Sequence, residues 1–217
     1  MRKSWYYVGG GLCVVLAIGL VIFWNDMGTL QRLMWISFMA LLSHQFEEYA
    51  WPGGFPPVMN IAWQPRQGGK ADRYPLNRQA SLFVNVFFAY PFYILPIIFP
   101  NLIWLGLAQV LTGMTQFGPH GILINRKMRS IYNPGLFAVV FLHWPIGIFY
   151  IYYVYSQGLV QLWMWPVAIL LVALFAVLGI YMPVNRWFLD PNSPYPFSEK
   201  EMARFHVKEK MERLNAR

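Results

Sequence analysis

The feature that most constrains this chain is a series of apolar stretches, each long enough to cross a lipid bilayer. A spanning helix needs roughly 20 mostly apolar residues. Six such stretches cover about residues 5–24, 30–49, 79–99, 102–124, 134–156 and 160–183. Because a helix satisfies its backbone hydrogen bonds internally, we expect an all-α, polytopic transmembrane helical bundle with six spans.

The composition agrees with a membrane protein. Hydrophobic residues make up 57% of the chain and charged residues only 12%, whereas soluble domains carry about 25% charged residues. The single cysteine, Cys13, lies within an apolar stretch. A lone cysteine excludes a disulfide framework and a cysteine-based metal site within the chain.

The basic residues indicate the orientation in the membrane. If the N-terminus is cytoplasmic, nearly all of the 17 Lys and Arg fall in the inner segments, and only Arg32 lies near an outer end. This is the positive-inside pattern of a multi-pass membrane protein. We therefore place both termini in the cytoplasm and interpret the net charge of +8 as topology rather than nucleic-acid binding. For a bacterial source, the membrane would be the inner membrane.

The chain divides into a six-span domain, residues 1–185, and a basic cytoplasmic tail, residues 186–217. Ser198 and Glu201 have the spacing of a capping box at the start of a short tail helix. We expect that helix to be solvated near anionic headgroups. The inner loop, residues 50–78, is rich in Pro and Gly, and we expect it to fold against the span ends.

Polar side chains gather near the cytoplasmic ends of the spans. The second span carries His44, Glu47 and Glu48 there, and the predicted topology puts Asn85 and His120 at a similar depth. Charged groups within a membrane are costly and usually face a bundle interior or a wet cavity. The sequence therefore predicts a buried polar pocket that opens toward the inner leaflet.

The helical register supports the same pocket. His44 and Glu48 are one turn apart on one face, with Glu47 slightly to the side. On the fourth span, polar residues recur at helical spacing at Gln109, Thr112, Gln116 and His120. Asn133, at the start of the fifth span, is a further candidate for the pocket wall. We interpret His143, deeper in that span, as a packing histidine, and His206 as solvated.

Two histidines and two glutamates suit a divalent metal such as Zn²⁺ or Fe²⁺. We expect His44, Glu48 and His120 to be the ligands, because a cation would relieve the repulsion between adjacent carboxylates. Glu47 would then be the general base or acid. The other interpretation is structural: a hydrogen-bond network, or glutamates paired with Arg66, Arg126 or Arg129.

Asn85 and Gln116 complete the predicted site, where they would orient the ligands or polarise the substrate. The most concrete interpretation is a membrane enzyme, by default a metal-dependent hydrolase. Its substrate would be a lipid or another amphipathic molecule reached from the inner leaflet. The sequence does not indicate the substrate or the oligomeric state.

Several motifs resemble those of the membrane proteins named for their HXXEE motif. The stretch "SHQFEEYAWPGGF" carries the first motif, and "FVNVFF" carries the third-span asparagine, Asn85. "FGPHG" carries the fourth-span His120, and "YNPGLF" at residues 132–137 resembles the family's start of the next span. The family has asparagine four residues before this histidine, where the chain has Gln116. The resemblance implies a multi-pass, enzyme-like membrane protein without implying a reaction.

Two alternative functions remain. Without a metal, a protonated Glu47 or Glu48 could act as a general acid that isomerises or cyclises an apolar substrate. Aromatic walls would then stabilise a carbocation, and the candidates are Trp51, Phe87, Phe88 and Tyr90. Alternatively, the two glutamates could carry protons or cations in a small transporter.

Overall fold

The computed structural model describes residues 1–216, and within that range the chain is helical with no strand. The predicted all-α class is therefore confirmed. The long helical segments are α1 (Trp5–Ile22), α2 (Thr29–Tyr49), α4–η3–α5 (Arg78–Leu82, Phe83–Phe88, Ala89–Ile98), α6 (Ile103–Thr115) with η4 (Gly118–Ile124), α8–η5–α9 (Leu136–Ala138, Val139–His143, Trp144–Ser156) and α10–η6–η7 (Met164–Leu174, Phe175–Tyr181, Pro183–Trp187).

Shorter elements connect these segments and form the tail. They are η1 (Trp24–Asp26), α3 (Phe55–Pro57), η2 (Val58–Trp63), α7 (Asn125–Met128), α11 (Glu199–Met202), η8 (Arg204–His206) and α12 (Val207–Asn215). The elements η2 to η7 are π-helical turns, while η1 and η8 are 3₁₀ turns.

Four helices of the described chain are long and apolar enough to cross a membrane. They are Trp5–Ile22, Arg78–Ile98, Leu136–Ser156 and Met164–Trp187. The last of these begins after the stretch Leu159–Trp163, so it starts later than the hydropathy of residues 160–183 suggests. The segments α2 and α6–η4 are absent from this set. Both segments carry buried polar side chains, and α6 is short because it already ends at Thr115.

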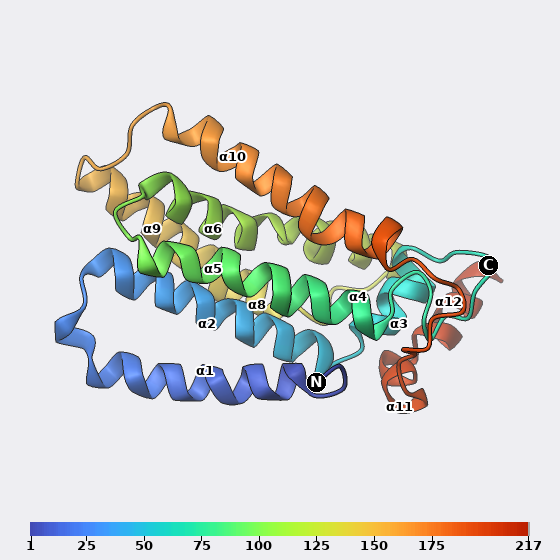
Figure 1. Ribbon diagram of the computed structural model, residues 1–217. Helices are drawn as coiled ribbons and strands as arrows, with labels where there is room; N and C mark the ends of the chain where they lie inside the picture. The colour runs from blue at the N-terminus through green and yellow to red at the C-terminus, as the bar shows by residue number, and fades with distance from the viewer. Residues whose placement is uncertain (217) are drawn as a thin grey trace.

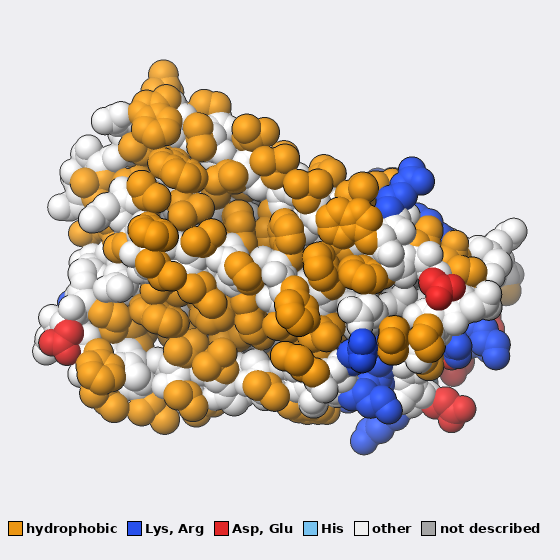
Figure 2. All heavy atoms as spheres, viewed as in Figure 1, with side chains coloured by type: hydrophobic (Ala, Val, Ile, Leu, Met, Phe, Trp, Pro, Cys, Tyr) orange, Lys and Arg blue, Asp and Glu red, His pale blue; other side chains and the backbone are white. Residues whose placement is uncertain are grey.

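The long helices pack side by side in one bundle (Figure 1). In it α1 packs on α2, α2 on α5, α6 on α9, and α10 on α6. Both termini lie at the same end of the bundle (Figure 1). Figure 2 shows that Lys and Arg side chains gather at this end, while the visible flank of the bundle is mainly hydrophobic. The basic side chains are therefore concentrated at one end of the bundle.

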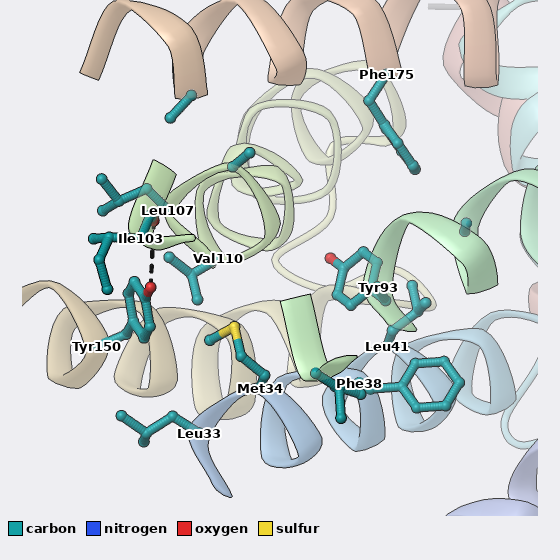
Figure 3. Close-up of a cluster of buried hydrophobic side chains, with 14 of the residues drawn as sticks. Leu33, Met34, Phe38, Leu41, Tyr93, Ile103, Leu107, Val110, Tyr150 and Phe175 are labelled. Atoms are coloured by element: carbon teal, nitrogen blue, oxygen red, sulfur yellow. Dashed lines mark hydrogen bonds between the residues drawn. The ribbon is translucent and has the colours of Figure 1, made fainter. Parts of the chain in front are cut away.

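The core lies between α2, α5, α6 and α9, and Figure 3 shows its side chains. Tyr150 on α9 is fully buried, and its hydroxyl donates a hydrogen bond to the carbonyl of Ile103, 3.3 Å away (Figure 3). A Cβ at Gly106 would lie only 2.0 Å from that hydroxyl oxygen. Glycine therefore lets α6 and α9 approach closely, as small residues do in membrane bundles.

The loop at residues 50–78 is folded, as predicted. Asn60 is buried, and its side-chain amide donates to the carbonyls of Ala71 and Leu76, both at 2.8 Å. Its side-chain oxygen accepts a hydrogen bond from the backbone N–H of Leu76 at 3.0 Å. One asparagine thus links η2 to the start of α4.

The tail starts with the predicted capping box, in which Ser198 and Glu201 exchange hydrogen bonds with each other's backbone. The prediction that the tail is a solvated helix is wrong for its first half. Phe197 and Val207 are buried, the latter among residues of η2, η4 and α7. The contacts of Val207 come from segments at least 79 residues distant in sequence, so the pattern of the tail alone did not show them.

Arg204 attaches the tail to the end of α2. Its Nη1 donates to the carbonyls of Tyr49 and Ala50, at 3.0 and 2.8 Å. Carbonyls at a helix C-terminus lack intrahelical partners and attract cations. A Cβ at Gly53 would lie 1.6 Å from Arg204 Nη1, and Gly53 has a φ of +70°. Glycine is therefore required at this position by both the backbone and the arginine.

The orientation is testable by cysteine labelling in a Cys13→Ser background. Asn101→Cys lies in the turn between α5 and α6, and Gln67→Cys lies in the loop at the basic end. We expect an impermeant maleimide to label Cys at position 101 in intact cells and Cys at position 67 only after the membrane is disrupted. The opposite pattern would reverse the topology.

Candidate functional site

Three ionisable side chains from two helices converge inside the bundle. His44 and Glu48 come from α2, His120 comes from η4, and all three are buried. Glu48 Oε1 lies 3.6 Å from His44 Nε2 and 3.3 Å from His120 Nε2. One ligand atom from each side chain lies within 4.8 Å of the other two.

These separations suit a metal ion. A tetrahedral site with metal–ligand bonds of about 2.1 Å has its ligand atoms about 3.4 Å apart. The two distances to Glu48 are close to this value. The three residues predicted as ligands are therefore brought together in an arrangement that could hold a divalent ion.

The remaining nitrogen of each histidine is occupied by a protein acceptor. His44 Nδ1 donates to the carbonyl of Gly135 at 3.0 Å, and His120 Nδ1 donates to Oδ1 of Asn133 at 2.8 Å. The Asn133 amide donates in turn to the carbonyl of His120 and to Asn125, which fixes its orientation. In neutral rings, both Nε2 atoms therefore carry the free lone pair and face Glu48. Metal-binding histidines usually have such second partners.

Gly135 stands between the two histidines. Its φ is +102°, and a Cβ there would lie 2.6 Å from Cε1 of His120 and 2.8 Å from Cε1 of His44. Any larger residue would push the rings apart and strain the backbone. The Asn-Pro-Gly sequence thus supplies both an acceptor for each histidine and the space between them.

Glu47 does not join this cluster. Its carboxylate accepts hydrogen bonds from the Tyr132 hydroxyl at 2.8 Å and from the backbone N–H groups of Phe137 and Ala138, at 3.0 and 2.8 Å. Those N–H groups are at the N-terminus of α8, where a negative charge is stabilised. Glu47 therefore caps the fifth helix and faces a groove between α1 and α8, away from the cavity.

Tyr132 is held in its donor form. Burial raises the pKa of its hydroxyl well above the usual range, and the hydrogen bond to the Glu47 carboxylate raises that pKa further. The phenol therefore stays protonated across physiological pH and keeps donating to Glu47.

The cluster opens onto a cavity of about 530 Å³. Asn85 on η3 and Gln116 at the end of α6 both line this cavity. His143 also lines it, with its ring centroid 5.7 Å from that of His44. A Cβ at Gly113 would lie 2.3 Å from His143 Nδ1, so the ring packs directly on α6.

The structure does not support two details of the alternative interpretations. Within residues 1–216, the ion pairs of Glu48 are with histidines, and neither Glu47 nor Glu48 pairs with an arginine. The proposed aromatic walls are also misplaced, because none of the four lines the cavity: Trp51, Phe87, Phe88 and Tyr90. Trp51 and Phe87 are exposed, while Phe88 packs on Phe175 and Tyr90 on Phe38.

Sequence reasoning missed several residues of the site. In the sequence, Tyr132 and Gly135 stand out only as part of a motif, although Tyr132 donates to Glu47 and Gly135 accepts from His44. Tyr49 and Ser81 also line the cavity and are absent from the predicted site. The spacing of Ser81 and Asn85, one helical turn, was an available signal for a shared polar face.

Comparison with known families gives one match. A family model described as "Protein of unknown function with HXXEE motif" matches residues 35–150, more than half of the 217 residues. The chain belongs to the HXXEE family. The matched region contains each residue of the cluster and the segment that holds it, from His44 to Ala138. Comparisons with curated proteins and with solved structures gave no match.

The structural role of Glu47 is testable by Glu47→Gln. The glutamine amide would place a donor against the backbone donors of α8, and buried unsatisfied donors cost about 1–3 kcal/mol each. We expect the free energy of unfolding in detergent micelles to fall by about that amount. Glu212→Gln, an exposed change on α12, is the control. Equal stability of the two variants would contradict this role.

Proposed function

We propose that this HXXEE protein is a membrane-embedded, metal-dependent enzyme, by default a hydrolase. Its ion would be Zn²⁺ or Fe²⁺, held by His44, Glu48 and His120. Its substrate would be a lipid or another amphipathic molecule that reaches the cavity from the inner leaflet. The convergence of these three ligand atoms in a buried site carries the proposal.

The donor set and its surroundings fit such an ion. Two imidazoles and one carboxylate are a common ligand set for catalytic zinc and for non-haem iron. Burying Glu48 without a cation would be costly at this depth. Both histidines also have Nδ1 acceptors, on Gly135 and Asn133, that direct Nε2 toward Glu48.

A divalent ion bound here would supply a Lewis acid that polarises a carbonyl and lowers the pKa of water. The residues of the chain would do the rest. His143 faces the same cavity beside His44 and could accept and return a proton. Asn85 and Gln116, which both line the cavity, would orient the substrate. Glu47 would act as a positioning residue, in place of the general base first expected.

Metal content tests this proposal. We expect about one equivalent of Zn or Fe in protein purified without chelators or a histidine tag, measured by elemental mass spectrometry. His44→Ala, Glu48→Gln and His120→Ala should each lose it, because each removes one of three ligands. Metal-free wild-type protein would contradict the proposal and favour a general acid or a proton-coupled transporter.

Two matched variants control the measurement. Glu212→Gln changes an exposed glutamate of α12, and His206→Ala removes an exposed histidine of the tail. We expect both to keep the metal. Loss of metal from either folded control would show that the loss does not report on the three ligands.

The Asn133→Ala variant tests the histidine acceptors. Without Asn133 Oδ1, the His120 ring loses the partner that sets its orientation. Loss of such outer partners typically lowers metal affinity about 10–100-fold. We expect that decrease in competition with a chelating dye, and no change for Asn101→Ala in the exposed outer turn. Equal affinities would exclude this role for Asn133.

A further inference from the structure

The cavity beside the cluster has two chemically different walls. One wall belongs to α10 and η6 and is apolar except for Tyr181 at its end, with Ile169, Val172, Ala173, Phe175, Ala176 and Ile180. Facing parts of the cavity carry hydroxyl, amide and imidazole groups from α2, α4, η3 and α6. A ligand that satisfies both walls has an apolar chain and a polar end.

A second polar group lies in this cavity, apart from the three candidate ligands. It consists of Tyr49, Ser81 and Asn85, which all line the cavity. The Tyr49 hydroxyl lies near the side chains of the other two residues, but not in hydrogen-bond geometry with the Ser81 hydroxyl. The Asn85 amide donates to the carbonyl of Ser81 at 2.9 Å, which leaves its side-chain oxygen as an acceptor.

The Ser81 hydroxyl lacks a partner. Ser81 is only 1% exposed, and its Oγ makes no hydrogen bond within residues 1–216. Buried polar groups are nearly always hydrogen-bonded, to protein or to a bound molecule. A ligand atom that accepts from or donates to this hydroxyl would complete the group.

The charge of the cavity wall restricts the headgroup. Within residues 1–216 no lysine or arginine lines the cavity, and its ionisable carboxylate is Glu48. The basic side chains are instead gathered at the end of the bundle (Figure 2). A phosphate or sulfate next to Ser81 would be buried without the charge-assisted partners that such groups normally have. A hydroxyl, ester or amide needs only neutral partners.

We propose that Tyr49, Ser81 and Asn85 form a subsite for the uncharged headgroup of a neutral amphiphile, whose chain lies along α10 and η6. The substrate class would be a neutral lipid such as an acyl ester, acyl amide or long-chain alcohol. This inference rests on the proposed function, which says where the reaction would take place. Binding at the subsite does not itself require the metal.

Two probes that differ only in charge test the subsite. They are a monoacylglycerol and a lysophosphatidic acid with the same acyl chain, each carrying a photoreactive group near the chain end. Saturable crosslinking to purified protein in nanodiscs measures binding, and peptide mapping locates it. We expect the neutral probe to label α10 or η6 and to bind at least tenfold more tightly. Equal or tighter binding of the lysophosphatidic acid would overturn the proposal.

The Ser81→Ala variant supplies the residue-level test. It should weaken the binding of the neutral probe about tenfold, which corresponds to the loss of one hydrogen bond. It should not lower the free energy of unfolding, because the hydroxyl lacks a protein partner. Tyr49→Phe provides a second, equally small change, and Ser156→Ala, exposed at the end of α9, is the control. Unchanged binding in both Ser81→Ala and Tyr49→Phe would also overturn the proposal.

Metal removal from the wild-type protein separates this inference from the metal proposal. We expect wild-type protein stripped with a chelator to bind the neutral probe as the untreated protein does. Wild-type protein that binds this probe but no metal would contradict the metal-dependent enzyme and leave the subsite supported. Protein that binds metal but prefers the anionic probe would contradict the subsite alone.

Discussion

The cap that Glu47 places on the N-terminus of α8 is the interaction on which the rest of the site depends. One carboxylate receives two backbone N–H groups and the hydroxyl of Tyr132. It therefore fixes the start of the fifth helix against the end of the second. The same short segment then presents the carbonyl of Gly135 to His44 and the amide of Asn133 to His120. The position of the start of α8 relative to α2 thus determines the orientation of the His44 and His120 rings.

The two adjacent glutamates show how far sequence reasoning reached. Apolar length and helical spacing were enough to predict an all-α bundle and to group His44, Glu48 and His120. They assigned Glu48 as a ligand and Glu47 as a general base or acid in the same pocket, although successive helical residues point about 100° apart. That rotation sends one carboxylate into the cavity and the other toward α8. The position of α8 relative to α2 is a tertiary property, so the role of Glu47 could not be read from α2 alone.

Gly53 and Gly54, which follow the HXXEE motif, show the same dependence on tertiary contacts over a longer distance in sequence. In isolation, Gly53 and Gly54 indicate only a turn. In the structure, Arg204 and Phe205 occupy the space where their side chains would be. Arg204 also satisfies carbonyls at the end of α2, one residue beyond Glu48. The tail is therefore part of the framework around the site, although Arg204 is more than 150 residues from the end of α2 in sequence.

Proline explains a further part of the geometry. His120 lies on a π-helical turn that contains Pro119, and His143 ends a π-helical turn two residues before Pro145. Proline has no N–H to donate and its ring collides with the preceding turn, so the regular helix is interrupted at these points. A π-helical turn adds room for one residue and rotates the side chains that follow. His120 and His143 thus owe their direction to a nearby proline, which a regular spacing of 100° per residue cannot reproduce.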